Sequence, residues 1–321
     1  MKTIPGLDLV SQDLLRVEGK MQEAPHENIE PLTVAMDTLL KSGGKRIRPA
    51  LALLVGRLYE SSSDKVIALA AAVEMLHTAT LVHDDLIDGA LLRRGNSTLN
   101  ANWSPAATVL TGDFSFAWAA NLAAQTENVR VINIFSQTLM IICGGELRQY
   151  FRPPWREQSR QDYDRRIYAK TASLFAATTE AAAVLVGAPE PQVKALREYG
   201  CQLGMAFQIV DDVLDFTGSP TEMGKPVGSD MRQGIVTLPL LYYLGQHPDD
   251  DMLPQVFESR ASNEVIESVV ARIRSAGAIE TAMRDARTHI RRAQAALDEF
   301  PANGYRQTML DLADFVVQRR T

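Results

Sequence analysis

Apolar residues recur every three or four positions through almost the whole chain, and this is the period of one face of an α-helix. Alternating runs of β-branched residues between turns, which would indicate strands, are scarce. Breaks between the helical stretches fall at turn-forming residues such as Gly43-Gly44 and Pro153-Pro154. Since no break is long enough to be an interdomain linker, the sequence predicts a single all-α domain over residues 1–321.

The apolar period predicts about ten helices. The clearest cover residues 28–41, 49–59, 63–87, 105–124, 129–150, 159–186 and 190–216. A shorter helix is expected at residues 237–244, and three more within residues 263–300 and 304–319. Alanine-rich stretches such as residues 68–72 predict closely packed interior helices, because small side chains let helix axes approach each other.

The charge balance argues against a dedicated nucleic-acid-binding protein. The chain has 33 basic and 39 acidic residues, a net charge of −6, whereas nucleic-acid binders usually carry a basic excess. The start has no apolar signal segment, and uninterrupted apolar runs fall short of the ~20 residues that a membrane span needs. We therefore expect a cytoplasmic protein without stable membrane insertion. Cys143 and Cys201 lie in apolar helical stretches and are expected to be buried thiols.

Three aspartates stand at the end of the long apolar stretch at residues 63–87. On a helix, Asp84 and Asp88 lie one turn apart on the same face, and Asp85 lies beside them. Converging carboxylates suit hard divalent cations, and Mg²⁺ tends to bridge a few carboxylates to phosphate oxygens. A solvated acidic patch is the simpler interpretation, and this motif alone does not decide between the two.

The same Asp-Asp-x-x-Asp pattern returns much later, again at the end of an apolar helix. Two intact copies are far less expected by chance than one. Six acids lining one cavity would be costly unless cations neutralised them. The pair of motifs is the strongest functional signal in the sequence. It predicts six metal ligands, which are Asp84, Asp85, Asp88, Asp211, Asp212 and Asp215.

Basic residues stand where a phosphate group would need them. Gly43-Gly44 precedes Lys45 and Arg48, which combines close backbone approach with a point charge and a planar guanidinium. Arg93 and Arg94 follow the first acidic motif closely, so metal and guanidinium could hold the same phosphate. Taken alone, the first of these groups reads more simply as the basic start of a helix.

In their order along the chain, these motifs resemble those of the trans-polyprenyl (isoprenyl) diphosphate synthases. Besides the two acidic motifs, the matching segments are Gly43 to Pro49, Glu74 with Leu76-His77, Arg93-Arg94-Gly95, Gly112-Asp113, Gly145-Glu146, Lys170-Thr171, Phe207-Gln208 and Gly224-Lys225. The resemblance implies a large antiparallel helix bundle around a deep central cavity, the isoprenoid synthase type of fold, and usually a homodimer. It also implies an enzyme that condenses isopentenyl diphosphate with an allylic prenyl diphosphate to give an all-trans polyprenyl diphosphate.

The resemblance assigns roles to individual residues. The diphosphate of isopentenyl diphosphate would be held by Lys45, Arg48, His77 and Arg94. The allylic diphosphate would be held by Mg²⁺, in three ions, together with Arg93, Lys170 and Lys225. Thr171 and Gln208 would lie beside the allylic carbon, and Phe207 could offer its ring face to a cation. One departure is Ile235, which follows Gly234 where the family often has a second lysine, so one diphosphate contact could be missing.

Product length follows from the residues before the first acidic motif. Short-chain members of the resembled family tend to place an aromatic residue near the fifth position before it, as a floor for the growing tail. Here Ala79 and Thr80 are small, which favours a C30 to C50 product. A floor formed by Phe114, Phe116 or Trp118 would instead favour C15 to C20. A non-catalytic partner subunit and a terpene cyclase are further alternatives, although both usually lack some of these motifs.

Overall fold

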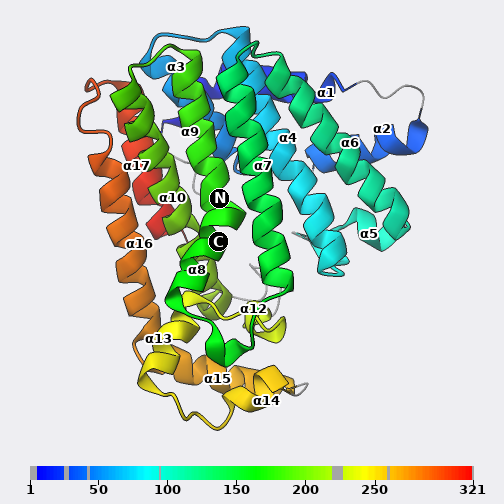
Figure 1. The fold of residues 1–321 in the computed structure, drawn as a ribbon, viewed down its shortest axis with the longest axis vertical. Coiled ribbons are helices and arrows are strands. Elements are labelled where there is room, and N and C mark those ends of the chain that lie inside the picture. The colour runs from blue at the N-terminus through cyan, green and yellow to red at the C-terminus, as the bar shows by residue number, and fades with distance from the viewer. Residues whose placement is uncertain are drawn as a thin grey trace. The chain divides into compact units, whose positions relative to one another are not determined.

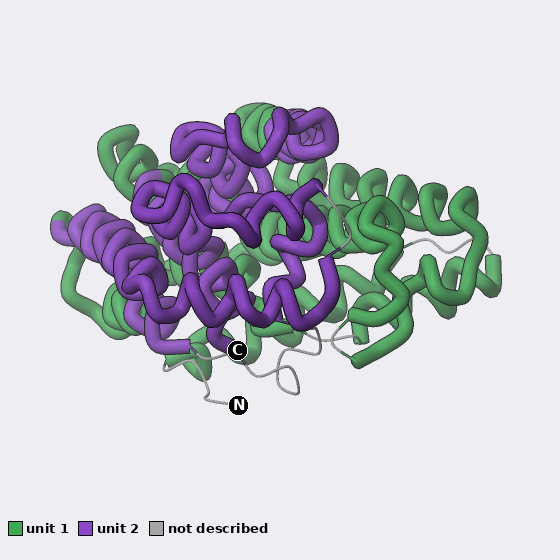
Figure 2. The backbone as a smooth tube through the Cα atoms, turned by 90° about the horizontal axis from the view of Figure 1, so that it is seen from below, with its two compact units in different colours: residues 1–138, 177–197, 299–312 green, residues 139–176, 198–298, 313–321 purple. Residues whose placement is uncertain are grey.

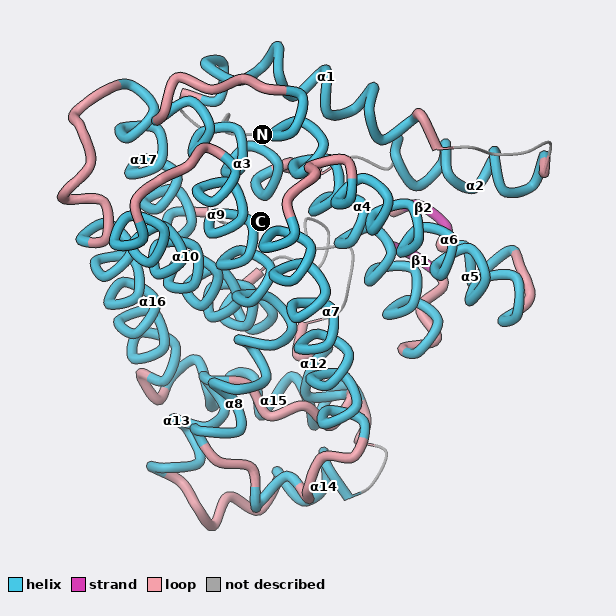
Figure 3. The backbone as a smooth tube through the Cα atoms, turned by 45° about the horizontal axis from the view of Figure 1, so that its top comes forward, coloured by secondary structure: helices cyan, strands magenta, loops and turns pink. Residues whose placement is uncertain are grey.

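A computed structural model describes residues 6–24, 29–41, 44–93, 95–218, 227–258 and 261–319. In these ranges the chain is helical nearly throughout (Figure 1). The strands found there are the two-residue β1 (Leu92–Arg93) and β2 (Asn96–Ser97), which pair antiparallel beside α5 (Leu99–Asn102) (Figure 3). The all-α class predicted from the apolar period is confirmed.

The remaining helices follow one another along the chain. The first part of the chain contains η1 (Leu7–Val10), α1 (Ser11–Gln22), α2 (Glu30–Lys41), α3 (Ile47–Leu58), α4 (Asp64–Ile87) and α6 (Pro105–Ala124). The middle part contains α7 (Val129–Tyr150), η2 (Trp155–Glu157), α8 (Arg160–Ile167), the π-helix η3 (Tyr168–Ala172), α9 (Ser173–Leu185) and α10 (Glu190–Thr217). The last part contains α12 (Ser229–Arg232), α13 (Leu238–Gln246), α14 (Leu253–Glu258), α15 (Asn263–Ser275), α16 (Ala278–Ala295) and α17 (Gly304–Gln318).

The chain divides into two compact units (Figure 2). Unit 1 contains residues 1–138, 177–197 and 299–312, and unit 2 contains residues 139–176, 198–298 and 313–321. Several boundaries fall inside helices, namely α7, α9, α10 and α17, so these helices contribute to both units. The single domain expected from the sequence stays a prediction.

In unit 1, α4 is the central helix. Helices α1, α3 and α6 pack against it, and residues 66–76 are buried on every side. A helix surrounded in this way is apolar all round rather than amphipathic. Trp118 of α6 is also tied to α1, because its indole Nε1 donates a hydrogen bond to the carbonyl oxygen of Met21 at 3.1 Å.

By length and composition, α4 could cross a membrane, but 78% of its most apolar window is buried inside the protein. Its uninterrupted apolar runs are shorter, because Glu74 and His77 interrupt them. The buried core helix of a folded domain passes the same test of length and composition, so α4 is weak evidence for a membrane span.

One long predicted helix contains a π-helical turn. Ser159 and Asp162 form a reciprocal capping box that begins α8. The helix then widens into the π-helix at residues 168–172 before α9 continues it. The prediction of a helix over residues 159–186 is confirmed to within one residue at each end, but apolar periodicity did not reveal the π-helical turn inside it. Helices α12, α13, α14 and α15 gather at one end of unit 2 (Figure 1).

The structure also tests the other predicted helix bounds and the expected burial of the cysteines. The structure confirms the helices at residues 105–124 and 129–150 with the predicted bounds. No separate bounds were predicted for the helices α1 and α14. The expectation of buried cysteines is wrong for Cys143, which is exposed on α7, and Cys201 is partly exposed.

Candidate active site

The first acidic motif ends α4 in unit 1. Asp84 is half-buried, and Asp88, one turn further on, is the exposed C-cap residue. Asp85 is 7% exposed and forms an ion pair with Arg93, whose Nη2 lies 2.7 Å from its Oδ1. A turn at Gly89, whose φ is 62°, reverses the chain after α4, so that β1 carries Arg93 back to the helix end. The motif thus places two carboxylates on one face, while its middle aspartate fixes a guanidinium beside them.

The helix α6 approaches this helix end closely because Gly112 has no side chain. A Cβ on Gly112 would lie 2.3 Å from Nε2 of His83, the residue before Asp84. The His83 ring is held there, with Nε2 3.2 Å from the carbonyl oxygen of Val109 and the ring centroid 5.2 Å from that of Phe116. Packing of α6 therefore positions the start of the acidic motif.

The basic segment before α3 is anchored to α4 by a buried ion pair. Nη1 of Arg46 lies 2.8 Å from Oε1 of Glu74, which is 5% exposed. Arg46 adopts a left-handed backbone conformation with φ of 47°, which a non-glycine residue rarely does without a stabilising contact. Lys45 and Arg48 flank this anchor and are half-buried, and His77 lies three residues after Glu74 on α4. The pair thus joins the segment bearing Lys45 and Arg48 to the face of α4 that carries His77.

The second acidic motif lies in α10 in unit 2. The Asp211 side chain is 42% exposed, and its Oδ1 lies 2.7 Å from Nη2 of Arg319. Asp215 is 1% exposed and accepts a hydrogen bond from the backbone N–H of Asp230 at 3.2 Å. Asp212 is 3% exposed. The three carboxylates therefore have unequal access to solvent, with Asp211 the most exposed.

Asp212 is held by two side-chain donors. The Tyr163 hydroxyl donates to its Oδ2 at 2.8 Å, and Nε2 of Gln208 donates to its Oδ1 at 2.9 Å. Burial raises the pKa of Asp212 to about 7, and the charge of Asp230 adds to this rise, while the two hydrogen bonds oppose it. A cation bound nearby would favour the ionised carboxylate.

The π-helix places Lys170 and Thr171 beside α7 and α10. Lys170 Nζ lies 2.9 Å from Oε1 of Glu146, and Thr171 Oγ1 donates to Oε1 of Gln208 at 2.6 Å. A Cβ on Gly145 of α7 would lie 2.5 Å from the Ala169 methyl group, so that glycine allows the close approach. Gly204 likewise allows α10 to approach the π-helix, since a Cβ on Gly204 would lie 2.6 Å from the Cα of Ala172. Such π-helical turns occur frequently at functional sites.

Two residues in this site were not predicted. The Arg319 guanidinium lies 3.8 Å from the ring centroid of Phe207, and the Arg319 side chain is only 4% exposed. It therefore covers the aromatic ring that was expected to face a cation. Nothing in the sequence marks Arg319, because it stands near the chain end without a neighbouring motif. Tyr163 is a single aromatic residue in a polar stretch, a pattern equally typical of ordinary core packing.

The predicted site residues divide between the units. Unit 1 holds Asp84, Asp85, Asp88, Lys45, Arg48, His77 and Arg93, and unit 2 holds Asp211, Asp212, Asp215, Lys170, Thr171, Phe207 and Gln208. The structure brings members of each set together within their own unit. That the two aspartate trios act on one ligand stays a prediction. Arg94 and Lys225 lie outside the described residues.

The aspartates fit a hard divalent cation by their chemistry. Among the described residues, no three Asp, Glu, His or Cys side chains converge closely enough to form a metal site by themselves. Each helix end nevertheless presents carboxylate oxygens one turn apart, which are the ligands that Mg²⁺ prefers. The partial exposure of Asp211 and the raised pKa of Asp212 also fit a carboxylate pair that a cation would complete.

Comparison with known protein families gives a match over most of the chain. Residues 29–273 match the Polyprenyl synthetase family. The heptaprenyl diphosphate synthase component 2 of Geobacillus stearothermophilus is 38% identical over 321 residues, which cover 99% of each chain. The octaprenyl diphosphate synthase of Haemophilus influenzae is 38% identical over 283 residues, which cover 88% of this chain and 86% of that one.

Solved structures give the same result. The polyprenyl synthase from Caulobacter crescentus, complexed with calcium and isoprenyl diphosphate, has a TM-score of 0.94 at 35% identity, with complete coverage of both chains. A geranylgeranyl pyrophosphate synthase from Lactobacillus brevis has a TM-score of 0.89 at 29% identity, covering 97% of each chain. The fold is therefore shared by proteins whose names give different product lengths.

Proposed function

The chain belongs to the polyprenyl synthetase family and is a prenyltransferase, and we propose that it makes all-trans polyprenyl diphosphates of C30 to C50. The reaction condenses an allylic prenyl diphosphate with isopentenyl diphosphate and repeats on the lengthened product. The observation that carries this proposal is the pair of intact aspartate trios, each at the end of a helix that also positions basic or polar side chains.

The basic residues divide between the two substrates. Lys45, Arg48 and His77 hold the diphosphate of isopentenyl diphosphate, and the buried Arg46–Glu74 pair supports that segment. Arg93 and Lys170 hold the allylic diphosphate, each oriented by a carboxylate at 2.7 and 2.9 Å respectively. Arg94 and Lys225 complete the two sets in this proposal. Guanidinium and ammonium groups suit this task because charge-assisted hydrogen bonds to phosphate are strong.

The six aspartates hold Mg²⁺, with three ions as the proposed number. When bound, Mg²⁺ neutralises the allylic diphosphate and so stabilises the charge that builds on it as it leaves. That a related structure is complexed with calcium and isoprenyl diphosphate supports a divalent cation in this family.

The protein acts by positioning and electrostatics. Arg93 and Lys170 stabilise the departing diphosphate while the allylic C–O bond breaks, and Lys45 and Arg48 orient isopentenyl diphosphate. The double bond of isopentenyl diphosphate attacks the allylic carbon, a C–C bond forms, and one proton is lost. The released diphosphate accepts this proton, so no side chain is required as a base. Thr171 and Gln208, joined by a hydrogen bond, are proposed to lie beside the allylic carbon.

Small residues on α4 support a long product. Ala79 is fully buried, five residues before Asp84, and carries no aromatic ring that could stop a growing tail. Trp118, one alternative floor, is fixed in the core by its bond to Met21. Relatives at up to 38% identity over nearly the whole chain are named heptaprenyl and octaprenyl diphosphate synthases. A C15 or C20 product remains the second candidate, since a geranylgeranyl pyrophosphate synthase shares the fold.

The enzyme is proposed to be a homodimer. Large apolar side chains are exposed on α6, with Leu110 at 67% and its neighbour Val109 at 39%. Exposed apolar residues grouped in this way are typical of interaction surfaces. The cytoplasmic location expected from the sequence stays a prediction.

One experiment separates these functions. The purified full chain is incubated with Mg²⁺, labelled isopentenyl diphosphate and an allylic primer, and products are identified by mass spectrometry. Products of C30 to C50 are expected from the isolated chain. A terminal C15 or C20 product would remove the long-chain proposal but keep the enzyme class. No incorporation by the chain alone would favour a subunit that needs a partner, an alternative suggested by the relative named component 2.

A further inference from the structure

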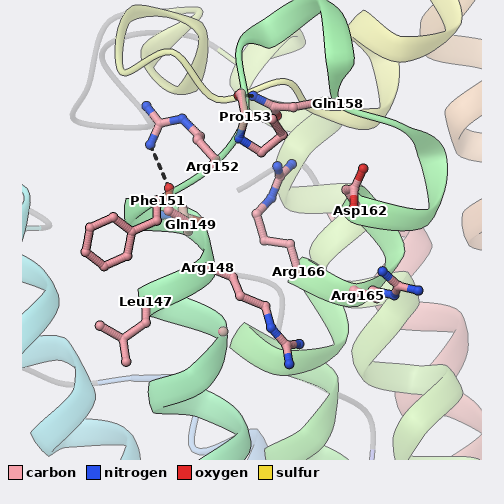
Figure 4. Close-up of a pocket in the computed structure, with 11 residues that line it drawn as sticks. Leu147, Arg148, Gln149, Phe151, Arg152, Pro153, Gln158, Asp162, Arg165 and Arg166 are labelled. Atoms are coloured by element: carbon pink, nitrogen blue, oxygen red, sulfur yellow. Dashed lines mark hydrogen bonds between the residues drawn. The ribbon is translucent and has the colours of Figure 1, made fainter.

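A pocket lies in unit 2, between the end of α7, the loop that follows it, and α8 (Figure 4). Its volume is about 620 Å³. It is lined by Gly145, Leu147, Arg148, Gln149, Phe151, Arg152, Pro153, Gln158, Asp162, Arg165 and Arg166. None of the residues assigned above to substrate or metal binding lines this pocket, so it calls for a separate explanation.

Four arginines and a single carboxylate line the pocket. The Asp162 carboxylate already accepts hydrogen bonds from the backbone N–H of Ser159 at 3.0 Å and from its hydroxyl at 2.6 Å. It belongs to the capping box of α8 and is therefore committed to starting that helix. The hydrogen bonds from Ser159 lower the pKa of Asp162 and the charge of Arg165 adds to this effect, but one carboxylate cannot neutralise four guanidinium groups.

Two of the arginines are fixed by neutral groups. Arg152 donates to the carbonyl oxygens of Gln149 at 3.0 Å and Gln233 at 2.6 Å, and Arg166 donates to that of Val236 at 2.6 Å. These bonds orient the guanidinium groups without neutralising them. Burial lowers the pKa of Arg152, and the nearby charge of Arg166 lowers it further, so the two side chains repel each other.

The other two arginines are exposed on facing elements. Arg148 comes from α7 and Arg165 from α8 (Figure 4). Within the described part of the chain, neither guanidinium forms an ion pair or a hydrogen bond. Arginine binds phosphate well, because its planar fork can donate two parallel hydrogen bonds to one anion.

An apolar surface adjoins this charge. Leu147 of α7 is 60% exposed, and Phe151, the residue directly after α7, is 76% exposed. We propose that this pocket binds a phosphate or diphosphate group through Arg148 and Arg165, with an attached apolar portion lying against Leu147 and Phe151. The phosphate could belong to a free phosphorylated molecule or to the headgroup of an anionic phospholipid, and the chemistry of recognition is the same.

The test compares two double variants of the full chain. Arg148→Gln with Arg165→Gln removes two charges from the pocket. Arg287→Gln with Arg292→Gln removes two exposed charges from α16 in the same unit and serves as the matched control. Both variants should retain turnover within about twofold of wild type, because none of these residues belongs to the proposed catalytic machinery.

The first probe is labelled inorganic diphosphate, measured by equilibrium dialysis in EDTA, so that no divalent cation links it to the aspartates. Wild type and control should bind one equivalent of diphosphate that the pocket variant does not bind. If the pocket variant still binds that equivalent, its affinity should be about tenfold lower than in wild type. The second probe is a vesicle of phosphatidylglycerol, compared with one of phosphatidylcholine in a cosedimentation assay.

Loss of diphosphate binding in the pocket variant would assign the site to a free phosphorylated ligand. Unchanged diphosphate binding with loss of phosphatidylglycerol binding would assign it to a lipid headgroup. If the pocket variant binds both probes as wild type does, or wild type binds neither at this site, the proposal is overturned. Turnover is measured separately, so failure here leaves the proposed prenyltransferase function untouched.

Discussion

At the scale of single residues, Asp212 shows how the fold prepares a carboxylate for a cation. The side chain is almost fully buried and its pKa is raised to about 7, yet Tyr163 and Gln208 each donate a hydrogen bond to it. Burial favours the neutral acid, whereas the two donors favour the ionised form. A bound cation would tip this balance toward the carboxylate, so metal binding should release protons below neutral pH.

The raised pKa predicts a pH-dependent stability without metal. A carboxyl group with a folded pKa of about 7 and an unfolded pKa of about 4 stabilises the fold fully at low pH. That contribution is lost as pH rises through 7. In EDTA, the free energy of unfolding, measured with urea, should therefore fall less from pH 4 to pH 8 in Asp212→Asn than in wild type.

The exposed Asp249 provides the control, because Asp249→Asn should keep the wild-type slope. Identical slopes for Asp212→Asn and wild type would mean that Asp212 titrates as an ordinary exposed acid.

At the scale of elements, the π-helix at residues 168–172 depends on two glycines. Gly145 and Gly204 leave room on either side of it, and the neighbouring Glu146 and Gln208 then receive Lys170 and Thr171. Close packing positions Lys170 and Thr171, since a methyl group on either glycine would overlap the π-helix.

Adjacent glycines in α7 offer a matched test. Gly145→Ala should cost about 1–3 kcal/mol of stability through overpacking against Ala169, and should reduce turnover because Lys170 is displaced. Gly144 has nothing within 4 Å of an added Cβ, so Gly144→Ala should stabilise the helix by about 0.5–1 kcal/mol and preserve turnover. Thermal melts and initial rates distinguish the two. Equal stability and turnover in Gly144→Ala and Gly145→Ala would argue against a role for the close contact between Gly145 and Ala169.

The small residues of α4 are expected to set product length. Ala79→Tyr should place a ring below the acidic motif and shift the terminal product to fewer isoprene units, as seen by mass spectrometry. Ala302→Tyr, at an exposed position, should leave the product unchanged. Because a buried tyrosine could also destabilise the fold, the melting temperature is measured in parallel. A stable Ala79→Tyr enzyme with wild-type products would locate the floor elsewhere.

At the scale of the whole molecule, the exposed apolar residues of α6 predict the oligomeric state. The change of Val109→Asp with Leu110→Asp should convert a dimer into a monomer, as measured by light scattering, because charges in an apolar interface are costly. Leu15→Asp on α1, at 62% exposure, should leave the dimer intact. A wild-type monomer would refute the homodimer, and an unchanged double variant would exclude this surface.

The sequence predicted the helical class and the bounds of α6 and α7 because apolar periodicity is a local signal. It also found both aspartate trios and Lys170-Thr171, since these are local motifs. It could not reveal the π-helix, because an inserted residue barely changes the apolar pattern. Arg319 was not predicted for a different reason. Its contact with Asp211 joins residues far apart in the chain, and only the folded structure brings them together.

The central claim is that both aspartate trios act in one metal-dependent condensation. Initial rates of isopentenyl diphosphate incorporation at saturating Mg²⁺ test it in the full chain. Asp84→Ala in unit 1 and Asp211→Ala in unit 2 should each lower turnover by about a thousandfold or more. The exposed control Asp249→Ala should retain wild-type turnover. Near wild-type turnover in Asp211→Ala or Asp84→Ala would contradict the claim.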